Sequence, residues 1–266
     1  MRSARFGFFF FLLFFNLLVG AQQIAPQQTQ PTTTKDPPAI SVINQVLNAA
    51  GGSQAISAIS SYIATGTINY LTNGETNAQG NVTVRALGLN LFRIDTTAPW
   101  GARSEVTNVR TSVKDANGVV TTLRTQPSLA AARFILPYLH LRVAVGSNTL
   151  NVVYKGLVTV DGNSSHDIQI QQILPPGPDG KMSIMDSVSV DYFIDQSSFR
   201  VVMMQDTLPR YGSHQVRYSN FTPVNGVLVP FSITENLHGQ NTRLIQLNQI
   251  TFNSDSQTSD FVFQAQ

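Results

Sequence analysis

The stretch from Ser213 to Phe252 constrains the fold more than any other part of the chain. Its apolar and polar residues alternate with the two-residue period of a β-strand, and the pattern breaks at Asn225-Gly226 and at His238-Gly239. Pairs that end in glycine favour the left-handed backbone of tight hairpin turns. The alternation changes parity after Leu247, which indicates a β-bulge near Asn248. We therefore predict three antiparallel strands joined by two short turns.

The same signals recur through most of the chain. Alternating runs are separated by further turn pairs at Asn73-Gly74, Asn117-Gly118 and Asp161-Gly162. Their spacing is typical of an antiparallel sheet and predicts about ten or eleven strands. The long helices of a βαβ protein are missing from the pattern, so we expect a mainly β fold.

Two segments are predicted to be helical. Ala39–Ala50 has apolar residues at helical spacing and is followed by two glycines, which indicates a short amphipathic helix. Pro127–Leu141 begins with good helix formers and is apolar on most sides, and we expect Pro137 to kink or end it. A helix of that kind is either deeply buried or lines an apolar space.

The N-terminal segment has the three parts of a secretory signal peptide. Two arginines precede a nearly unbroken apolar run, Phe8–Val19, and small residues follow up to Ala21. The run of twelve residues is short for a retained membrane anchor, which needs about 20. We predict a signal peptide over 1–21, a disordered leader rich in Gln, Pro and Thr over 22–38, and a single β domain over 39–266.

Charge and cysteine content limit the partners and the location. Cleavage would remove two of the 17 Lys and Arg residues, leaving 15 against 15 Asp and Glu. A near-neutral chain does not predict a nucleic-acid partner. The chain has no cysteine, so no lipid can be attached at the cleavage site, and no stable membrane anchor is expected after cleavage. Together with the signal-like N-terminal segment, these features lead us to expect an exported protein, periplasmic or secreted in a bacterial host.

We find no pattern that predicts catalysis, a metal or a cofactor. The four histidines, His140, His166, His214 and His238, lack metal-ligand spacing and are interpreted as isolated surface or turn residues. The run 164–167 holds the residue types of a hydrolase triad, but neighbours on a strand point to opposite faces. We therefore do not expect an enzyme. An envelope hydrolase is the lowest-ranked of three hypotheses, because no set of catalytic residues in the sequence supports it.

The C-terminal meander carries a family resemblance. The order of Tyr218–Phe221, Val224–Phe231, His238-Gly239 and Ile245–Asn253 resembles the LolA-like superfamily of outer-membrane lipoprotein carrier and sorting proteins. The resemblance extends in outline over Ser41–Phe263 and implies an incomplete, curved antiparallel β-barrel with short helices as a plug or lid. It also implies a hollow that holds acyl chains without any catalytic residue.

Two functions follow as expectations. The first is an exported, non-enzymatic binding protein for a lipid or lipoprotein acyl group, with Phe92, Trp100, Phe134 and Leu136 as candidate lining residues chosen by composition. The second is a structural or partner-binding envelope protein whose barrel is filled by its own side chains. Neither predicts the ligand or the oligomeric state.

Overall fold

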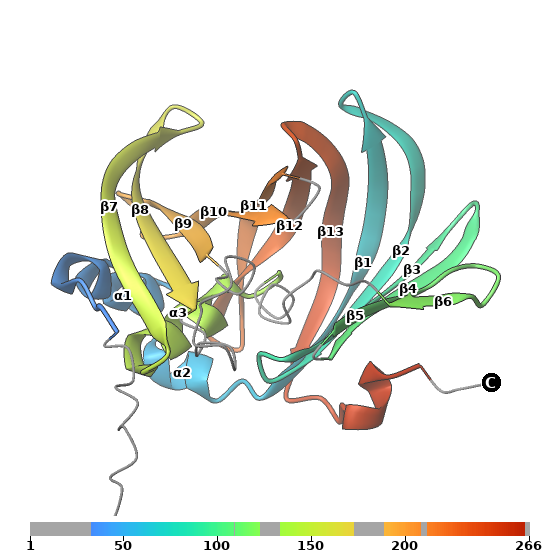
Figure 1. Cartoon of the computed structure of the whole chain (residues 1–266), viewed down its shortest axis with the longest axis horizontal. Coiled ribbons are helices and arrows are strands. Elements are labelled where there is room, and N and C mark those ends of the chain that lie inside the picture. Colours follow the sequence, from blue (N-terminus) through green and yellow to red (C-terminus); the bar gives the residue numbers. More distant parts are fainter. Residues whose placement is uncertain (1–32, 109, 123–133, 173–188, 209–211, 264–266) are drawn as a thin grey trace, which may run out of the picture. The chain divides into compact units, whose positions relative to one another are not determined.

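The computed structural model describes residues 33–108, 110–122, 134–172, 189–208 and 212–263, all within one unit, Thr32–Gln266. In these residues thirteen strands form one antiparallel sheet in the order β6-β5-β4-β3-β2-β1-β13-β12-β11-β10-β9-β8-β7 (Figure 1). The strands are β1 Ser61–Thr72, β2 Glu75–Leu87, β3 Leu91–Ala98, β4 Gly101–Asn108, β5 Arg110–Lys114, β6 Val120–Thr122, β7 Leu150–Val160, β8 Asn163–Gln172, β9 Ser189–Asp195, β10 Val201–Leu208, β11 Gly212–Val224, β12 Val227–Leu237 and β13 Gln240–Phe252.

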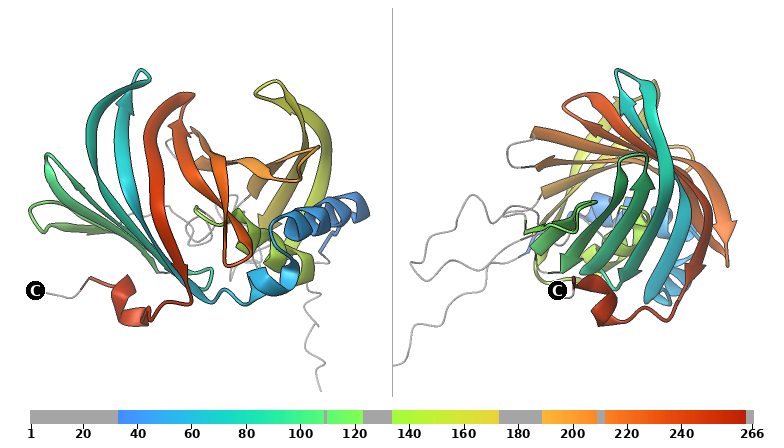
Figure 2. Two further views of the ribbon diagram at one scale, coloured as in Figure 1. Left: turned by 180° about the vertical axis from the view of Figure 1, so that it is seen from behind. Right: turned by 90° about the vertical axis from the view of Figure 1, so that its right-hand side faces the viewer.

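The sheet is strongly curved and stays open, since β6 and β7 are its two edges (Figure 2). The predicted fold class, an incomplete curved antiparallel β-barrel, is confirmed. The thirteen strands exceed the ten or eleven expected. The segment Glu105–Lys114, whose alternation is weak in the sequence, is divided between β4 and β5. Strand β7 is continuous but has a bulge between Tyr154 and Gly156.

The turns predicted from glycine pairs have the expected backbone. Asn73, Asn225 and His238 adopt φ values of 53°, 48° and 54°, and the glycine after each also has a positive φ. The predicted bulge is confirmed as well, because Thr65 pairs with Gln249 while Gly66 pairs with Leu247. Asn248 is therefore the extra residue of β13.

In the described part of the chain three α-helices accompany the sheet: α1 Pro37–Ala49, α2 Ser53–Ser57 and α3 Pro137–Gly146. A 3₁₀ turn, η3, covers Thr258–Phe261. The right-hand view of Figure 2 shows the α-helices on the inner side of the curved sheet. Helix α1 buries its apolar stripe, including Val42, Ile43 and Val46, as its helical spacing predicted.

Two expectations about these segments need correction. Pro137 opens α3 and does not end a helix, because proline fits the first turn, where its missing N–H has no helical partner. The predicted helix residues 127–133 lie outside the described residues. Ordered structure also begins before Ala39, since Val152 donates to the Thr34 carbonyl at 2.9 Å and Asp36 donates to Val152 at 2.9 Å. The signal peptide and residues 22–32 are outside the described part.

The junction between α1 and α2 is joined to the sheet at the β11–β12 turn. Leu228 donates a backbone hydrogen bond to the carbonyl of Ala50 at 2.9 Å. Gly51 has a φ of 118°, and a Cβ at this position would lie 2.1 Å from the carbonyl oxygen of Gly226. Only glycine permits this contact, so Gly51 sets how closely the helices approach the sheet.

The helices and the sheet share one apolar core. Buried residues of α1, α2 and α3 belong to the same cluster as inward side chains of the strands, among them Tyr62, Ile68, Tyr192 and Ile233. Among the described helices, none has the length and apolar character needed to cross a membrane.

Candidate binding site on the inner face of the sheet

The inner face of the sheet is the side that carries the buried apolar residues and meets the helices. Side chains on a strand alternate between faces, so Tyr62, Ala64 and Ile68 of β1 point inward together. Opposite Ile68 lies Ile245 of β13, and the inward alternation of β13 then reaches Arg243. The inner face is therefore apolar toward the helices and becomes charged toward the β12–β13 turn.

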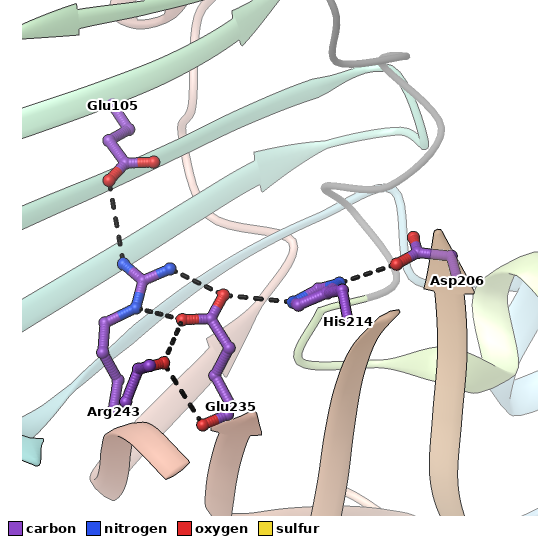
Figure 3. Close-up of polar contacts among 6 residues, drawn as sticks. Glu105, Asp206, His214, Glu235 and Arg243 are labelled. Atoms are coloured by element: carbon purple, nitrogen blue, oxygen red, sulfur yellow. Dashed lines mark hydrogen bonds and ion pairs between the residues drawn. The ribbon is translucent and has the colours of Figure 1, made fainter. Parts of the chain in front are cut away.

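Four charged side chains cross β10, β11, β12 and β13 in a row, which we call the charged ladder: Asp206, His214, Glu235 and Arg243 (Figure 3). His214 Nδ1 lies 2.7 Å from Asp206 Oδ1, and its Nε2 lies 3.1 Å from Glu235 Oε1. Arg243 donates from Nε and Nη2 to the two carboxylate oxygens of Glu235, the second bond measuring 2.8 Å. Asp206, His214 and Glu235 are each more than nine-tenths buried.

Strand register explains this arrangement. Asp206 is directly opposite His214, and Glu235 is directly opposite Arg243. His214 and Glu235 are diagonal neighbours, because Glu235 pairs with Val216, two residues along from His214. Opposite charges on directly facing and diagonal positions attract across a sheet, so the ladder links four strands on their inner side.

The ladder holds His214 in its charged form. Burial alone would lower the pKa of His214, but the hydrogen bonds to Asp206 and Glu235 outweigh it and raise the pKa to about 9. Both ring nitrogens then carry hydrogen and donate to the flanking carboxylates. Burial would raise the pKa of Glu235, yet the nearby Arg243 and His214 charges bring it well below its usual range. At neutral pH the ladder thus alternates negative and positive charges.

The ladder also reaches the far side of the curved sheet. Arg243 Nη1 lies 3.7 Å from Oε1 of Glu105 on β4. Strands β1, β2 and β3 separate β13 from β4 in the sheet order. The two side chains meet across the inner face only because the sheet curls, and this contact favours the curled form.

The predicted lining residues fall into two groups. Phe92 and Phe134 are buried and pack edge to face, with ring centroids 6.1 Å apart, and Leu136 is buried in the same apolar cluster. Trp100 lies apart from them in the β3–β4 turn, 54% exposed, with its ring 4.7 Å from that of Tyr70. The structure thus brings three of the four residues together, and whether any of them lines a ligand stays a prediction.

The interpretation of the histidines as isolated surface or turn residues is wrong for three of them. His214 is buried in the ladder, His140 is buried with its Nδ1 2.6 Å from the Tyr192 hydroxyl, and His166 lies 2.9 Å from the Tyr154 hydroxyl. His238 is exposed in its turn, as expected. A signal for the ladder was present, since Glu235 continues the inward alternation of Val229 and Ile233.

The triad-like run 164–167 is not assembled into a relay. His166 faces Tyr154, while Asp167 lies on the other face of β8, 3.6 Å from Lys155. Burial and the charge of Asp191 raise the pKa of Asp167. Within the residues that the structure describes, no group of three acidic, histidine or cysteine side chains is placed to hold a metal ion.

Comparison with solved structures supports the fold assignment. The match to a LolA superfamily protein from Nitrosomonas europaea covers 82% of this chain and 96% of that protein's chain, with 14% sequence identity and a TM-score of 0.53. The match to a DUF1329 family protein from Desulfovibrio piger covers 85% of this chain and 97% of that protein's chain, with 7% sequence identity and a TM-score of 0.52. No family model and no curated protein matches the sequence. The chain therefore has the fold of the LolA superfamily, as the resemblance in its sequence predicted.

Proposed function

We propose that this protein is an exported, non-enzymatic carrier that binds a lipid or lipoprotein acyl group on the inner face of its sheet. The observation that supports this most is the inner face itself. It is concave and apolar next to the helices (Figure 2), and the resemblance of the C-terminal meander to lipoprotein carrier and sorting proteins agrees with an acyl ligand. Burying an acyl chain there would gain about 0.8 kcal/mol for each methylene removed from water.

The charged ladder gives the proposed ligand an orientation. An acyl chain would lie toward the helix side, near Phe92 and Phe134, where the lining is apolar. A polar head group would lie toward the β12–β13 turn, where Arg243 and Glu105 are each about one quarter exposed. An amphiphile with one acyl end and one polar end fits this gradient better than a wholly apolar molecule.

The location of the protein is part of the proposal. The signal-like segment ending at Ala21 would deliver the chain to the bacterial periplasm or the exterior. A carrier there would shield acyl chains from water during transfer, and it would need no cofactor.

One observation favours the alternative of a structural or partner-binding protein. Helix α3 buries six of its residues, including Tyr138, Leu139 and Leu141, against the inner face. A helix so fully buried takes up apolar surface that an acyl chain would otherwise cover. If α3 holds this position permanently, the barrel is filled by its own side chains.

The two functions can be separated by direct binding. The exported protein is titrated with a fluorescent fatty acid, and palmitate or a synthetic triacylated lipopeptide is then used to displace the probe. The carrier proposal expects saturable binding that Phe134→Ala weakens at least about tenfold, a loss of about 1.4 kcal/mol. Leu157→Ala, an exposed apolar control on the edge strand β7, should bind normally. No saturable binding of any probe would favour the alternative.

A further inference from the structure

A second polar surface lies on the opposite side of the sheet from the charged ladder. Arg217 of β11 lies between Val216 and Tyr218, whose side chains are buried in the core, so Arg217 points outward. Ser165 of β8 is directly opposite Asp195 of β9. Each stands next to an inward-facing residue of its own strand, so both side chains also point outward. These outward side chains surround a pocket of about 300 Å³.

The pocket is joined to a second one at the ends of the hairpins. Asp161, in the β7–β8 turn, forms an ion pair with Arg217. This pair lines both the first pocket and another of about 570 Å³, whose walls come from the β1–β2 and β12–β13 turns. In Figure 1 these three turns lie at the same end of the strands, along the top of the view. We call the two pockets together the polar groove.

Each half of the groove contains a buried polar atom with no hydrogen-bond partner among the described residues. Ser165 is 0% exposed and its Oγ is unpaired, and Asn236 is 8% exposed and its Oδ1 is unpaired. Such atoms weaken the folded state, because they lose their water without gaining a partner. Atoms of this kind occur elsewhere among the described residues too, but these two belong to the walls of the groove, where a bound ligand would supply the missing hydrogen bonds.

The charges of the groove limit the ligand class. Asp161, Asp195 and Arg217 give the groove a formal charge of −1, and Arg217 is already paired. Hydrogen bonds from Ser198 and Ser197 lower the pKa of Asp195, so its carboxylate is ionised at neutral pH. An anion would meet repulsion here, and an apolar ligand would leave these groups without partners.

The remaining lining residues offer hydrogen bonds of both kinds. They are side-chain amides and hydroxyls: Asn73, Asn163, Ser219, Thr234, Gln240 and Asn241. Amides and hydroxyls both donate and accept, and a ligand that matches them must do the same at many positions. We propose that the polar groove binds a neutral carbohydrate, whose hydroxyl groups meet this requirement.

The proposal is tested by NMR chemical-shift titration of the exported protein with two neutral sugars, maltotriose and N,N′,N″-triacetylchitotriose. Exposed sugar sites are weak, so we expect a Kd on the order of 1 mM for one of them. Arg217→Gln and Ser165→Ala should each weaken binding at least about tenfold, or 1.4 kcal/mol. Arg85→Gln is the matched control, an equally exposed arginine paired with Asp95 outside the groove.

Stability measurements separate a binding role from a structural one. Ser165→Ala removes an unpaired hydroxyl, so its melting midpoint should rise by about 2–4 °C while binding falls. Any of three results would overturn the proposal. The first is that neither sugar produces chemical-shift changes at about 10 mM, ten times the expected Kd. The second is that both variants bind like the wild type, and the third is that inorganic sulfate binds in the groove while the sugars do not.

Discussion

The charged ladder makes the stability of this protein depend on one buried histidine. His214 has a pKa of about 9 in the folded protein and an ordinary value of about 6.5 in the unfolded chain. A raised pKa stabilises the folded state fully below pH 6.5, and this stabilisation disappears as pH rises through 9. From the two values, the His214 proton contributes about 2.5 kcal/mol at pH 7 and almost nothing at pH 10.

The assay is urea unfolding of the wild type and of His214→Gln at several pH values between 6 and 10. Gln keeps hydrogen-bonding capacity but does not titrate, so the other groups that lose protons cancel in the comparison. Between pH 7 and pH 9.5 the wild type should lose about 2 kcal/mol more unfolding free energy than the variant.

An NMR titration of the His214 ring gives an independent reading. Parallel losses of stability in the two proteins, or a ring pKa at or below 6.5, would refute the assignment of a charged histidine between Asp206 and Glu235.

Three further changes test other parts of the structure. Glu235→Gln removes the carboxylate that accepts hydrogen bonds from Arg243 and should lower the free energy of unfolding in urea by about 3 kcal/mol. A loss below about 1 kcal/mol would contradict a stabilising role of the charged ladder. Gly51→Ala forces a Cβ against the Gly226 carbonyl and should cost about 2 kcal/mol or more in thermal unfolding; an unchanged midpoint would mean that the contact is unimportant. Phe134→Ala leaves a space beside Phe92 and should cost about 3 kcal/mol in urea, whereas a neutral effect would place this ring outside the core.

Local sequence signals predicted the turns and the fold class well. Asn225-Gly226 and His238-Gly239 adopt left-handed backbone because glycine and small polar residues tolerate it. The change of alternation near Asn248 predicted the bulge, since one extra residue reverses which side chains face inward. These features depend on a few neighbouring residues and are visible without tertiary structure.

The ladder was missed because it depends on register across four strands. The alternation of β12 shows that Glu235 points inward, but only the pairing of β12 with β13 places Arg243 opposite it. The approach of Glu105 also depends on how far the sheet curls. His214 was dismissed because it has no metal-binding neighbour in sequence, while its actual partners, Asp206 and Glu235, lie eight and 21 residues away.

Proline gave an ambiguous local signal. A proline in a helical pattern is compatible with the end of one helix or the start of another, because its ring disrupts a helix interior but suits the first turn. Pro137 begins α3. Composition alone did not predict that Trp100 lies in the β3–β4 turn, 54% exposed and apart from the buried Phe92 and Phe134. Its position is set by strand length and turn placement, which composition does not contain.

The central proposal, that the inner face holds an acyl group, is tested most directly by native mass spectrometry of the exported protein purified from its host. The account predicts a mass above that of the polypeptide, which organic extraction removes, and an extracted molecule with one acyl part and one polar part. A bare polypeptide mass, together with no binding of added palmitate or triacylated lipopeptide, would contradict the account.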